Sequence, residues 1–187
     1  EENWVIEKSF LSEKKVILYS GNMGATHDLL TPLKIAKELS ESYNSFHFLF
    51  IGDGVQKKSL IDYTEQNNLK NVTFLPYQDS EVLPFSFAAA DFSIVSLSSG
   101  AEGLSVPSKT FYSLAAGSAI IAISEKGSEI EQLILNNDCG IFIEPNEVNL
   151  MKEFLINTSE LELEKKKKNA RILSKQFTVN NVKNFVK

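Results

Sequence analysis

Short continuous apolar runs alternate with stretches of helical periodicity along the first three quarters of the chain. Six runs suit strands that are buried on both faces: Val16 to Tyr19, Phe46 to Ile51, Val72 to Leu75, Phe92 to Val95, Ala119 to Ile123 and Ile141 to Ile143. Helical patterns separate them at Pro32 to Leu39, Val55 to Asn67, Glu81 to Ala90, Pro107 to Ala116 and Ser128 to Asn136. Thr31 is the predicted N-cap of the first helix. The alternation predicts an α/β fold, a doubly wound parallel sheet with helices on both faces.

After Pro145 the pattern is helical only, over Leu150 to Ile156 and then Leu161 to Phe177. The last segment contains the lysine run Lys165 to Lys168, which follows several glutamates. Glutamate four residues before lysine is typical of a solvated helix face. We therefore predict exposed i,i+4 pairs here rather than a membrane or nucleic-acid patch.

The composition narrows the choice of partners. The chain has 187 residues, 43% of them hydrophobic, and a net charge of −5, which suits one compact domain and gives no global attraction for nucleic acid. The single cysteine, Cys139, cannot form an internal disulfide and is predicted to be a buried filler. The sequence shows no apolar run near the ~20 residues that span a bilayer.

The segment from Glu102 to Ala122 places a carboxylate, several small residues and a helix start in succession. Pro107 suits the first turn of a helix, so we expect the helix to begin near Val106. Its free N–H groups and dipole would then face residues 102 to 105, where a phosphate is the usual occupant. The apolar stripe of this helix is predicted to be Phe111, Leu114 and Ala115.

This segment also carries a family resemblance. Glu102-Gly103-Leu104, Pro107-Ser108-Lys109 and Leu114-Ala115-Ala116-Gly117 resemble the nucleotide-sugar-binding segment of the family-four retaining glycosyltransferases, the glycosyl transferases group 1. Three further motifs match in the expected order: Tyr19 to Gly24 at the first strand and glycine turn, Ile51 to Gly54 at the second strand end, and Gly127 with Glu129-Ile130. Four motifs in register are specific, although each alone is weak.

The resemblance implies a B-type fold, in which two Rossmann-like domains face each other across a cleft. The chain resembles only the carboxyl-terminal, donor-binding domain. Residues 1–10 are then expected to be the remnant of an interdomain linker, and residues 11–187 the nucleotide-sugar-binding domain. The missing amino-terminal domain would hold the acceptor and make any membrane contact, and the whole protein would be cytoplasmic, at most peripheral to the inner membrane. No metal or other cofactor is implied, and UDP or GDP is the expected nucleotide of the sugar donor.

The resemblance also assigns candidate site residues. Glu102 is expected to contact the donor sugar and Lys109 to place its ammonium beside the diphosphate. The remaining donor-binding candidates are Gly21, Asn22, Gly24, His27, Gly52, Gly54, Tyr77, Gly103, Leu104, Ser105, Val106, Ser108 and Tyr112. Backbone N–H groups of residues 103–106 would hold the sugar or pyrophosphate, and the backbone near Tyr77 would read the base.

Two positions depart from the family pattern. Family members carry an arginine and then a lysine after the first glycine turn, where this chain has Asn22 and, further on, the neighbourhood of Thr26, His27 and Asp28. Lys109, with the dipole of its helix, is expected to supply the missing positive charge. Tyr112 replaces the glutamate that binds the ribose hydroxyls in the family, and a tyrosine cannot chelate a diol.

Other chemistries are disfavoured by the same motifs. The turn from Gly21 to Gly24 lacks the Lys-Ser/Thr pair of a Walker loop, and Lys57 replaces the third glycine of a dinucleotide fingerprint. Two histidines cannot build a multi-histidine metal centre. His47 is predicted to be a strand residue with a satisfied ring, whereas His27 is either a plain loop residue or a donor to the phosphate or sugar.

The predicted function is transfer of a hexosyl or N-acetylhexosaminyl group, with retention, from a nucleoside diphosphate sugar to a hydroxyl acceptor in bacterial polysaccharide or lipid-linked glycan synthesis. The domain alone is expected to bind nucleotide and transfer nothing. Two alternatives stay open. One is another enzyme of the same fold, a nucleotide-sugar epimerase or a phosphorylase, and the other is a degenerate, non-catalytic assembly domain.

Overall fold

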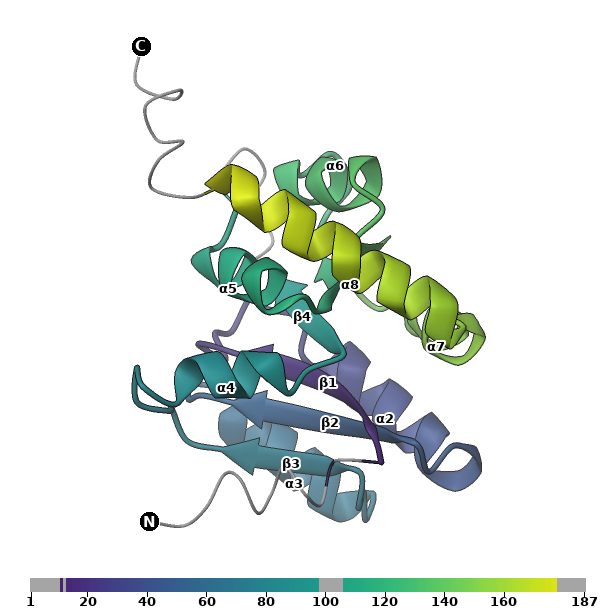
Figure 1. The fold of residues 1–187 in the computed structure, drawn as a ribbon. Helices are drawn as coiled ribbons and strands as arrows, with labels where there is room; N and C mark the ends of the chain where they lie inside the picture. Colours follow the sequence, from purple (N-terminus) through teal and green to yellow (C-terminus); the bar gives the residue numbers. More distant parts are fainter. Residues whose placement is uncertain (1–10, 12, 98–105, 178–187) are drawn as a thin grey trace.

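Six parallel strands form a single sheet in the order β3-β2-β1-β4-β5-β6 (Figure 1). The computed structural model describes residues 11, 13–97 and 106–177. The strands are β1 Lys15–Ser20, β2 Phe46–Ile51, β3 Val72–Leu75, β4 Phe92–Ser96, β5 Ala119–Ile123 and β6 Gly140–Ile143. The sequence prediction of a doubly wound parallel sheet is confirmed, because the strand order reverses direction after β3.

Helices cover both faces of this sheet. They are α2 Leu30–Ser42, α3 Lys57–Gln66, α4 Leu83–Ala88, α5 Ser108–Ala116, α6 Glu129–Asn136, α7 Val148–Asn157 and α8 Glu160–Ser174, followed by the short 3-10 helix η1 Lys175–Phe177. In Figure 1, α2 and α3 lie behind the strands and α4, α5 and α8 lie in front. Within the described residues, none of the helices has the length and apolar character needed to cross a bilayer.

Successive strand residues feed opposite cores, as the two-residue period of a strand requires. In β1, Ile17 and Tyr19 join the core beneath α2 and α7, whereas Val16 and Leu18 join the core beneath α4. Both sets are buried, so the strand reads as one continuous apolar run. The predicted filler Cys139 is confirmed as a buried free thiol in the core with α5, α6 and α8.

The N-cap prediction for the first helix is wrong. Thr31 lies inside α2, which begins at Leu30, and the N-cap is Leu29, whose side chain accepts no capping hydrogen bond. The carboxylate of Asp28 serves the first turn of the helix instead. It accepts hydrogen bonds from the Thr31 backbone N–H at 3.1 Å and the Thr31 hydroxyl at 2.7 Å, and from the Asn146 N–H at 2.9 Å. A carboxylate at a helix start accepts free N–H groups better than a hydroxyl that lies within the helix.

Helix α5 also differs from the prediction at its start and on its buried face. It begins at Ser108, with Pro107 as N-cap in an extended conformation at ψ 142°, so the expected start near Val106 was too early. Its buried residues are Thr110, Ser113 and Leu114, whereas Ala115 is exposed. Small polar side chains fill this face because the helix packs closely against α8 and the sheet.

The lysine run in α8 makes specific ion pairs rather than a uniformly solvated face. Lys165 and Lys166 both pair with Asp138, at 2.7 and 2.6 Å. Lys167 pairs with Asp91 at 3.2 Å and with Glu164, three residues earlier, at 3.1 Å. These three lysines therefore fasten α8 to the loops before β4 and β6, and none of these ion pairs is one of the expected i,i+4 contacts within α8.

Among these ion-pair partners, Asp91 is the one whose removal should cost the most stability. Its carboxylate also accepts the Val16 backbone N–H at 3.0 Å, and its side chain is 25% exposed. We expect Asp91→Ala to lower the free energy of unfolding by about 1–3 kcal/mol, because it leaves the N–H of the buried Val16 without its acceptor and leaves Lys167 with the exposed Glu164 as its remaining ion-pair partner. Glu164→Ala removes the 66% exposed partner of the same lysine and should cost less than about 1 kcal/mol. Urea unfolding of both variants checks this, and equal costs would contradict it.

Candidate functional site

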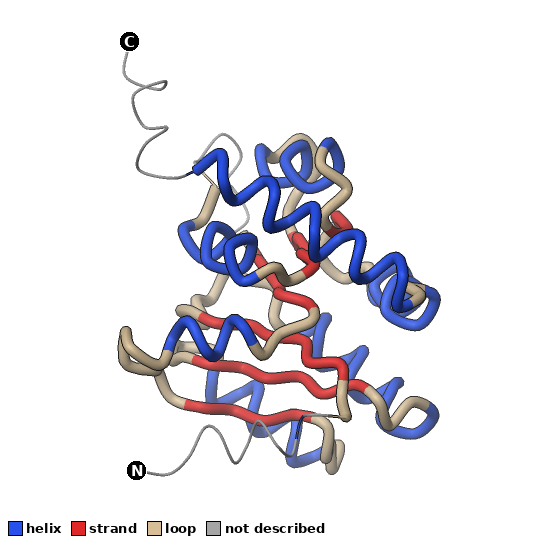
Figure 2. Tube along the Cα trace, in the orientation of Figure 1, coloured by secondary structure: helices blue, strands red, loops and turns tan. Residues whose placement is uncertain are grey.

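The glycine turns after β1 and β2 pack directly against each other at the carboxyl edge of the sheet. Figure 2 shows the loops at these strand ends gathered along one edge. Gly21 has φ 145° and Gly52 has φ 138°, a region that side chains rarely adopt. A Cβ at Gly52 would overlap the Gly21 carbonyl oxygen. The two motifs therefore need glycine so that two backbones can approach, and both belong to one site.

Side chains after the first turn are held around Gly24. The Asn22 amide nitrogen and the His27 ring lie 3.2 and 3.3 Å from where a Gly24 Cβ would stand. Gln56 fastens this loop from the second turn, since its amide donates to the carbonyl oxygens of Gly24 and of His27, the latter at 2.8 Å. Predicted site residues from both turns are thus brought together.

Lys109 reaches this cluster from the first turn of α5. Its ammonium donates to the Tyr19 hydroxyl at 3.2 Å and lies 4.4 Å from the centre of the Tyr19 ring. It also lies 3.3 Å from the place of a Gly21 Cβ. Among the residues that the structure describes, no ion pair joins Lys109 to a carboxylate within 4.0 Å. Lys109 therefore lies beside the glycine turns, and its expected contact with a diphosphate stays a prediction.

Burial and this positive charge shape the protonation of the site. Burial lowers the pKa of Lys109 from 10.5 to about 8. Burial, and then the charge on Lys109, lower the pKa of His27 below its ordinary 6.5. At neutral pH the cluster therefore contains an ammonium and a neutral imidazole. An anion placed between them would favour the charged form of both groups.

The remaining candidates lie further out or outside the described part of the chain. Tyr77 and Tyr112 are 57% and 56% exposed, and Tyr112 stacks on Phe87 of α4 with ring centres 5.8 Å apart. Ser108 is exposed at the start of α5 and Val106 is half-buried. Four further candidates lie outside the described residues: Glu102, Gly103, Leu104 and Ser105. Gly54, with φ 147°, completes the second turn, where a Cβ would lie 2.6 Å from the Met23 carbonyl oxygen.

Several residues that organise the site were not predicted from the sequence. Tyr19 contacts Lys109, Gln56 fastens the His27 loop, and Lys57 donates to the Gly52 carbonyl oxygen at 2.9 Å. These contacts span up to 90 residues, so no local spacing signals them. His47 is as predicted, a buried strand residue whose Nε2 lies 2.9 Å from the Thr73 hydroxyl oxygen.

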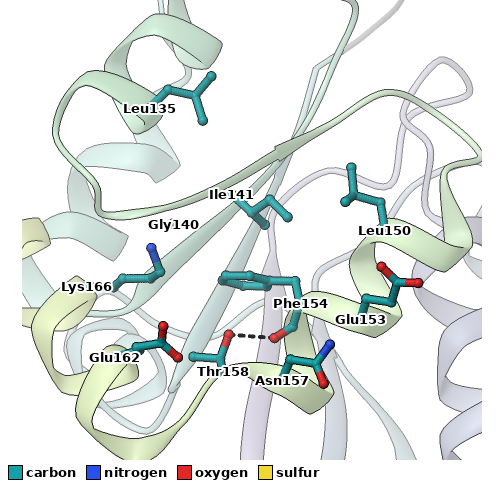
Figure 3. Close-up of a pocket in the computed structure, with 10 residues that line it drawn as sticks. All are labelled: Leu135, Gly140, Ile141, Leu150, Glu153, Phe154, Asn157, Thr158, Glu162 and Lys166. Atoms are coloured by element: carbon teal, nitrogen blue, oxygen red, sulfur yellow. Dashed lines mark hydrogen bonds between the residues drawn. The ribbon is translucent and has the colours of Figure 1, made fainter.

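Other parts of the described structure offer less chemistry. Residues 11, 13–97 and 106–177 contain no group of three or more His, Cys, Asp or Glu side chains placed to hold a metal ion. A pocket of about 400 Å³ lies between α6, β6, α7 and α8 (Figure 3). Its polar side chains include Lys166, which pairs with Asp138, and Thr158, which donates to the Phe154 carbonyl oxygen at 2.5 Å. These groups are already partnered, and the pocket shares no lining residue with the glycine turns.

A known protein family matches most of this chain, including the glycine turns and α5. The family model described as Glycosyl transferases group 1 matches residues 1–176, which is most of the chain. The chain belongs to this family. The resemblance drawn from the four sequence motifs is thereby confirmed.

Relatives and solved structures extend this result. The chain is 29% identical over 153 residues to "Probable glycosyltransferase WbjE" of Pseudomonas aeruginosa, covering 80% of the chain and 37% of that protein. It is 32% identical over 120 residues to a protein of Escherichia coli K12 named for colanic acid biosynthesis, the glycosyl transferase WcaI, covering 64% of the chain and 29% of that protein. The chain thus spans about a third of the length of the curated relatives that it matches.

Two solved structures share the fold. Anabaena HepE in complex with UDP-glucose superposes with a TM-score of 0.75 at 16% identity, over 95% of this chain and 49% of that one. The carboxyl-terminal domain of a glycosyl transferase group 1 family protein, LpcC of Francisella tularensis, superposes with a TM-score of 0.73 at 18% identity, over 96% of this chain and 95% of that one. The fold is therefore that of the carboxyl-terminal domain in B-type glycosyltransferases.

The lowered pKa of Lys109 predicts a pH-dependent stability. Between pH 8 and 10.5 the unfolded chain binds more protons at this lysine than the folded chain, so this site's contribution to the free energy of unfolding rises with pH in that window. Below pH 8 the cost of the buried charge is fully present. Lys109→Met removes it, so the variant should melt a few degrees above the parent at pH 7, and the difference should shrink as the pH approaches 10.5.

Lys37→Met is the matched control, because Lys37 is exposed on α2 and its removal changes the net charge equally. Calorimetric melting of the three proteins across pH 7 to 10.5 checks the prediction. A Lys109→Met variant that melts below the parent at pH 7 would show that the folded structure stabilises the ammonium.

Proposed function

We propose that this chain is the donor-binding domain of a retaining glycosyltransferase and that its carboxyl-edge cluster binds the diphosphate of a nucleotide sugar. The expected transfer is of a hexosyl or N-acetylhexosaminyl group to a hydroxyl acceptor. A separate amino-terminal domain of the full protein would hold that acceptor, with residues 1–10, which lie outside the described part, as the linker to it. The domain assignment is supported by the likeness to the LpcC carboxyl-terminal domain along nearly its whole length.

The observation that carries the proposal is the ammonium of Lys109. It is half-buried, it donates a hydrogen bond to the neutral hydroxyl of Tyr19, and its charge is not neutralised by any carboxylate of the described residues within 4.0 Å. A lysine whose charge has no binding role would be expected to extend its ammonium into water. An ammonium held in this way beside a glycine turn suits a diphosphate, which supplies the missing negative charge.

The start of α5 adds to the attraction. Pro107 provides no side-chain cap, and the first turn of the helix contains no acidic residue. The backbone N–H groups at this end and the positive end of the dipole therefore remain available to an anion. By contrast, the start of α6 is capped by the Ser128 hydroxyl and has Glu129 and Glu131 in its first turn.

These groups suit the chemistry of the departing diphosphate. When the bond from the sugar to the diphosphate breaks, negative charge develops on the leaving oxygen. A preorganised ammonium and free backbone N–H groups stabilise that charge without a metal ion. His27 lies beside the first turn, and the same anion would raise the lowered pKa of its imidazole. Asn22 can donate neutral hydrogen bonds from its amide, which are weaker than the arginine contact of the family pattern.

The names of the relatives support the choice of substrate and pathway. One structural neighbour is in complex with UDP-glucose, which favours UDP as the nucleotide, with GDP as the other candidate. One relative is named for colanic acid biosynthesis, which favours transfer into a bacterial polysaccharide or lipid-linked glycan. In this chain Glu102 is the proposed contact to the sugar.

Titration calorimetry of the 187-residue chain with UDP, GDP, dTDP, ADP and CMP tests the donor site. We expect one diphosphate to bind, and Lys109→Met to weaken that binding by roughly 10- to 100-fold, since a charge-assisted hydrogen bond contributes about 1.5–3 kcal/mol. Lys37→Met should bind as the parent does. Failure of every diphosphate to bind at millimolar concentration, or equal binding by Lys109→Met, would contradict the proposal.

A further inference from the structure

Tyr19 connects the two halves of the proposed diphosphate site. It is the fifth residue of β1, fully buried, and its hydroxyl is the meeting point of β1, the first glycine turn and α5. The hydroxyl donates to the Asn22 carbonyl oxygen at 2.5 Å and accepts a hydrogen bond from the Lys109 ammonium at 3.2 Å. We propose that Tyr19 is a positioning residue that holds the Lys109 ammonium, which pairs with no carboxylate of the described residues, where the diphosphate binds. This inference rests on the proposed function.

The direction of each hydrogen bond is fixed by the donors available. A phenol has a single proton, and a carbonyl oxygen can only accept, so that proton is used on Asn22. The lone pairs of the hydroxyl are then left for the ammonium of Lys109. Burial keeps the phenol neutral, because it raises the pKa of Tyr19 well above its ordinary value of 10. Tyr19 therefore orients the lysine without cancelling its charge.

This neutrality separates Tyr19 from an ordinary partner of a buried lysine. A carboxylate would hold the ammonium more strongly, but it would repel an incoming diphosphate and compete with it for the same charge. A hydroxyl and an aromatic face attract the cation weakly, through one hydrogen bond and a cation–π contact with a 4.4 Å separation. The ammonium is thus placed but remains free to bind a stronger anion.

Gly21 leaves room for that anion. The Lys109 nitrogen lies 3.3 Å from where a Gly21 Cβ would stand, so any side chain there would crowd the ammonium. The bond from Tyr19 to the Asn22 carbonyl ties the same glycine turn to the same tyrosine. The ammonium and the turn are therefore held at a fixed separation before a ligand arrives.

Such preorganisation has a measurable value. A lysine side chain loses conformational entropy when it is fixed in one position. Where the tyrosine has already fixed it, binding of the diphosphate does not incur that loss again. We therefore expect Tyr19→Phe, which keeps the ring and deletes only the hydroxyl, to weaken UDP binding by roughly tenfold.

A double-mutant cycle of Tyr19→Phe and Lys109→Met, measured by calorimetry with UDP, tests the inference. If Tyr19 acts through the lysine, the double variant should bind UDP as weakly as Lys109→Met alone, because the effect of the hydroxyl disappears when the ammonium is absent. Tyr43→Phe is the matched control, since Tyr43 is 39% exposed at the end of α2. Melting curves confirm that each variant is folded.

The outcomes separate the inference from the proposed function. Unchanged UDP binding in Tyr19→Phe, with strong loss in Lys109→Met, would overturn the role of Tyr19 and leave the donor site standing. An equal loss from Tyr19→Phe in both backgrounds would also overturn it, because the hydroxyl would then act through the glycine turn alone. Unchanged binding in Lys109→Met would instead overturn the diphosphate site itself.

Discussion

The close approach of two backbones at the carboxyl edge of a parallel sheet is the constraint on which the site depends. All six strands run the same way and are covered by helices, so every strand delivers its following loop to the same edge. At that edge the turns after β1 and β2 touch at Gly21 and Gly52. Any larger residue at Gly52 would push the turns apart and move Asn22, Gly24 and their neighbours with them.

The second determinant is the Lys109 ammonium, which has no carboxylate within 4.0 Å among the described residues. Burying a charge without an opposite charge costs stability, and the pKa of Lys109, about 8, reports that cost. The structure offsets part of it with the hydroxyl and ring of Tyr19. In a binding site for an anion, this cost is offset when the ligand binds, because the ligand supplies the opposite charge. By contrast, three lysines of α8 have carboxylate partners and serve only to fasten the helix.

The sequence was sufficient for most of the fold, because buried parallel strands are continuous apolar runs and the helices between them keep their own period. All six strands lie where these runs predict them. The helix starts were less predictable. Thr31 resembled a cap, but the carboxylate of Asp28, which serves the first turn, lies two residues before the helix and also bonds to Asn146, 118 residues away. Long-range partners of this kind leave no trace in local spacing.

The sequence pointed to several residues of the candidate site but not to the contacts between them. The glycine turns and Lys109 were identifiable because family motifs carry them, and the structure places them in contact. Tyr19 was overlooked, because in the sequence it is one more aromatic residue in a buried strand, and its hydroxyl acquires a role only when α5 folds against β1. Tyr112 shows the reverse case. It stands where the family has the glutamate that binds the ribose hydroxyls, so the sequence put ribose recognition in question. The structure shows its ring stacked on Phe87, and its role in donor binding stays a prediction.

The most direct test of the account is the pKa of Lys109, measured through the ¹³Cε resonance of the labelled lysine with and without saturating UDP. We expect a pKa of about 8 in the free protein and a clear rise when UDP binds, because the diphosphate stabilises the charged ammonium. A pKa that is the same in the free and UDP-saturated protein would contradict it, since Lys109 would then not face the diphosphate.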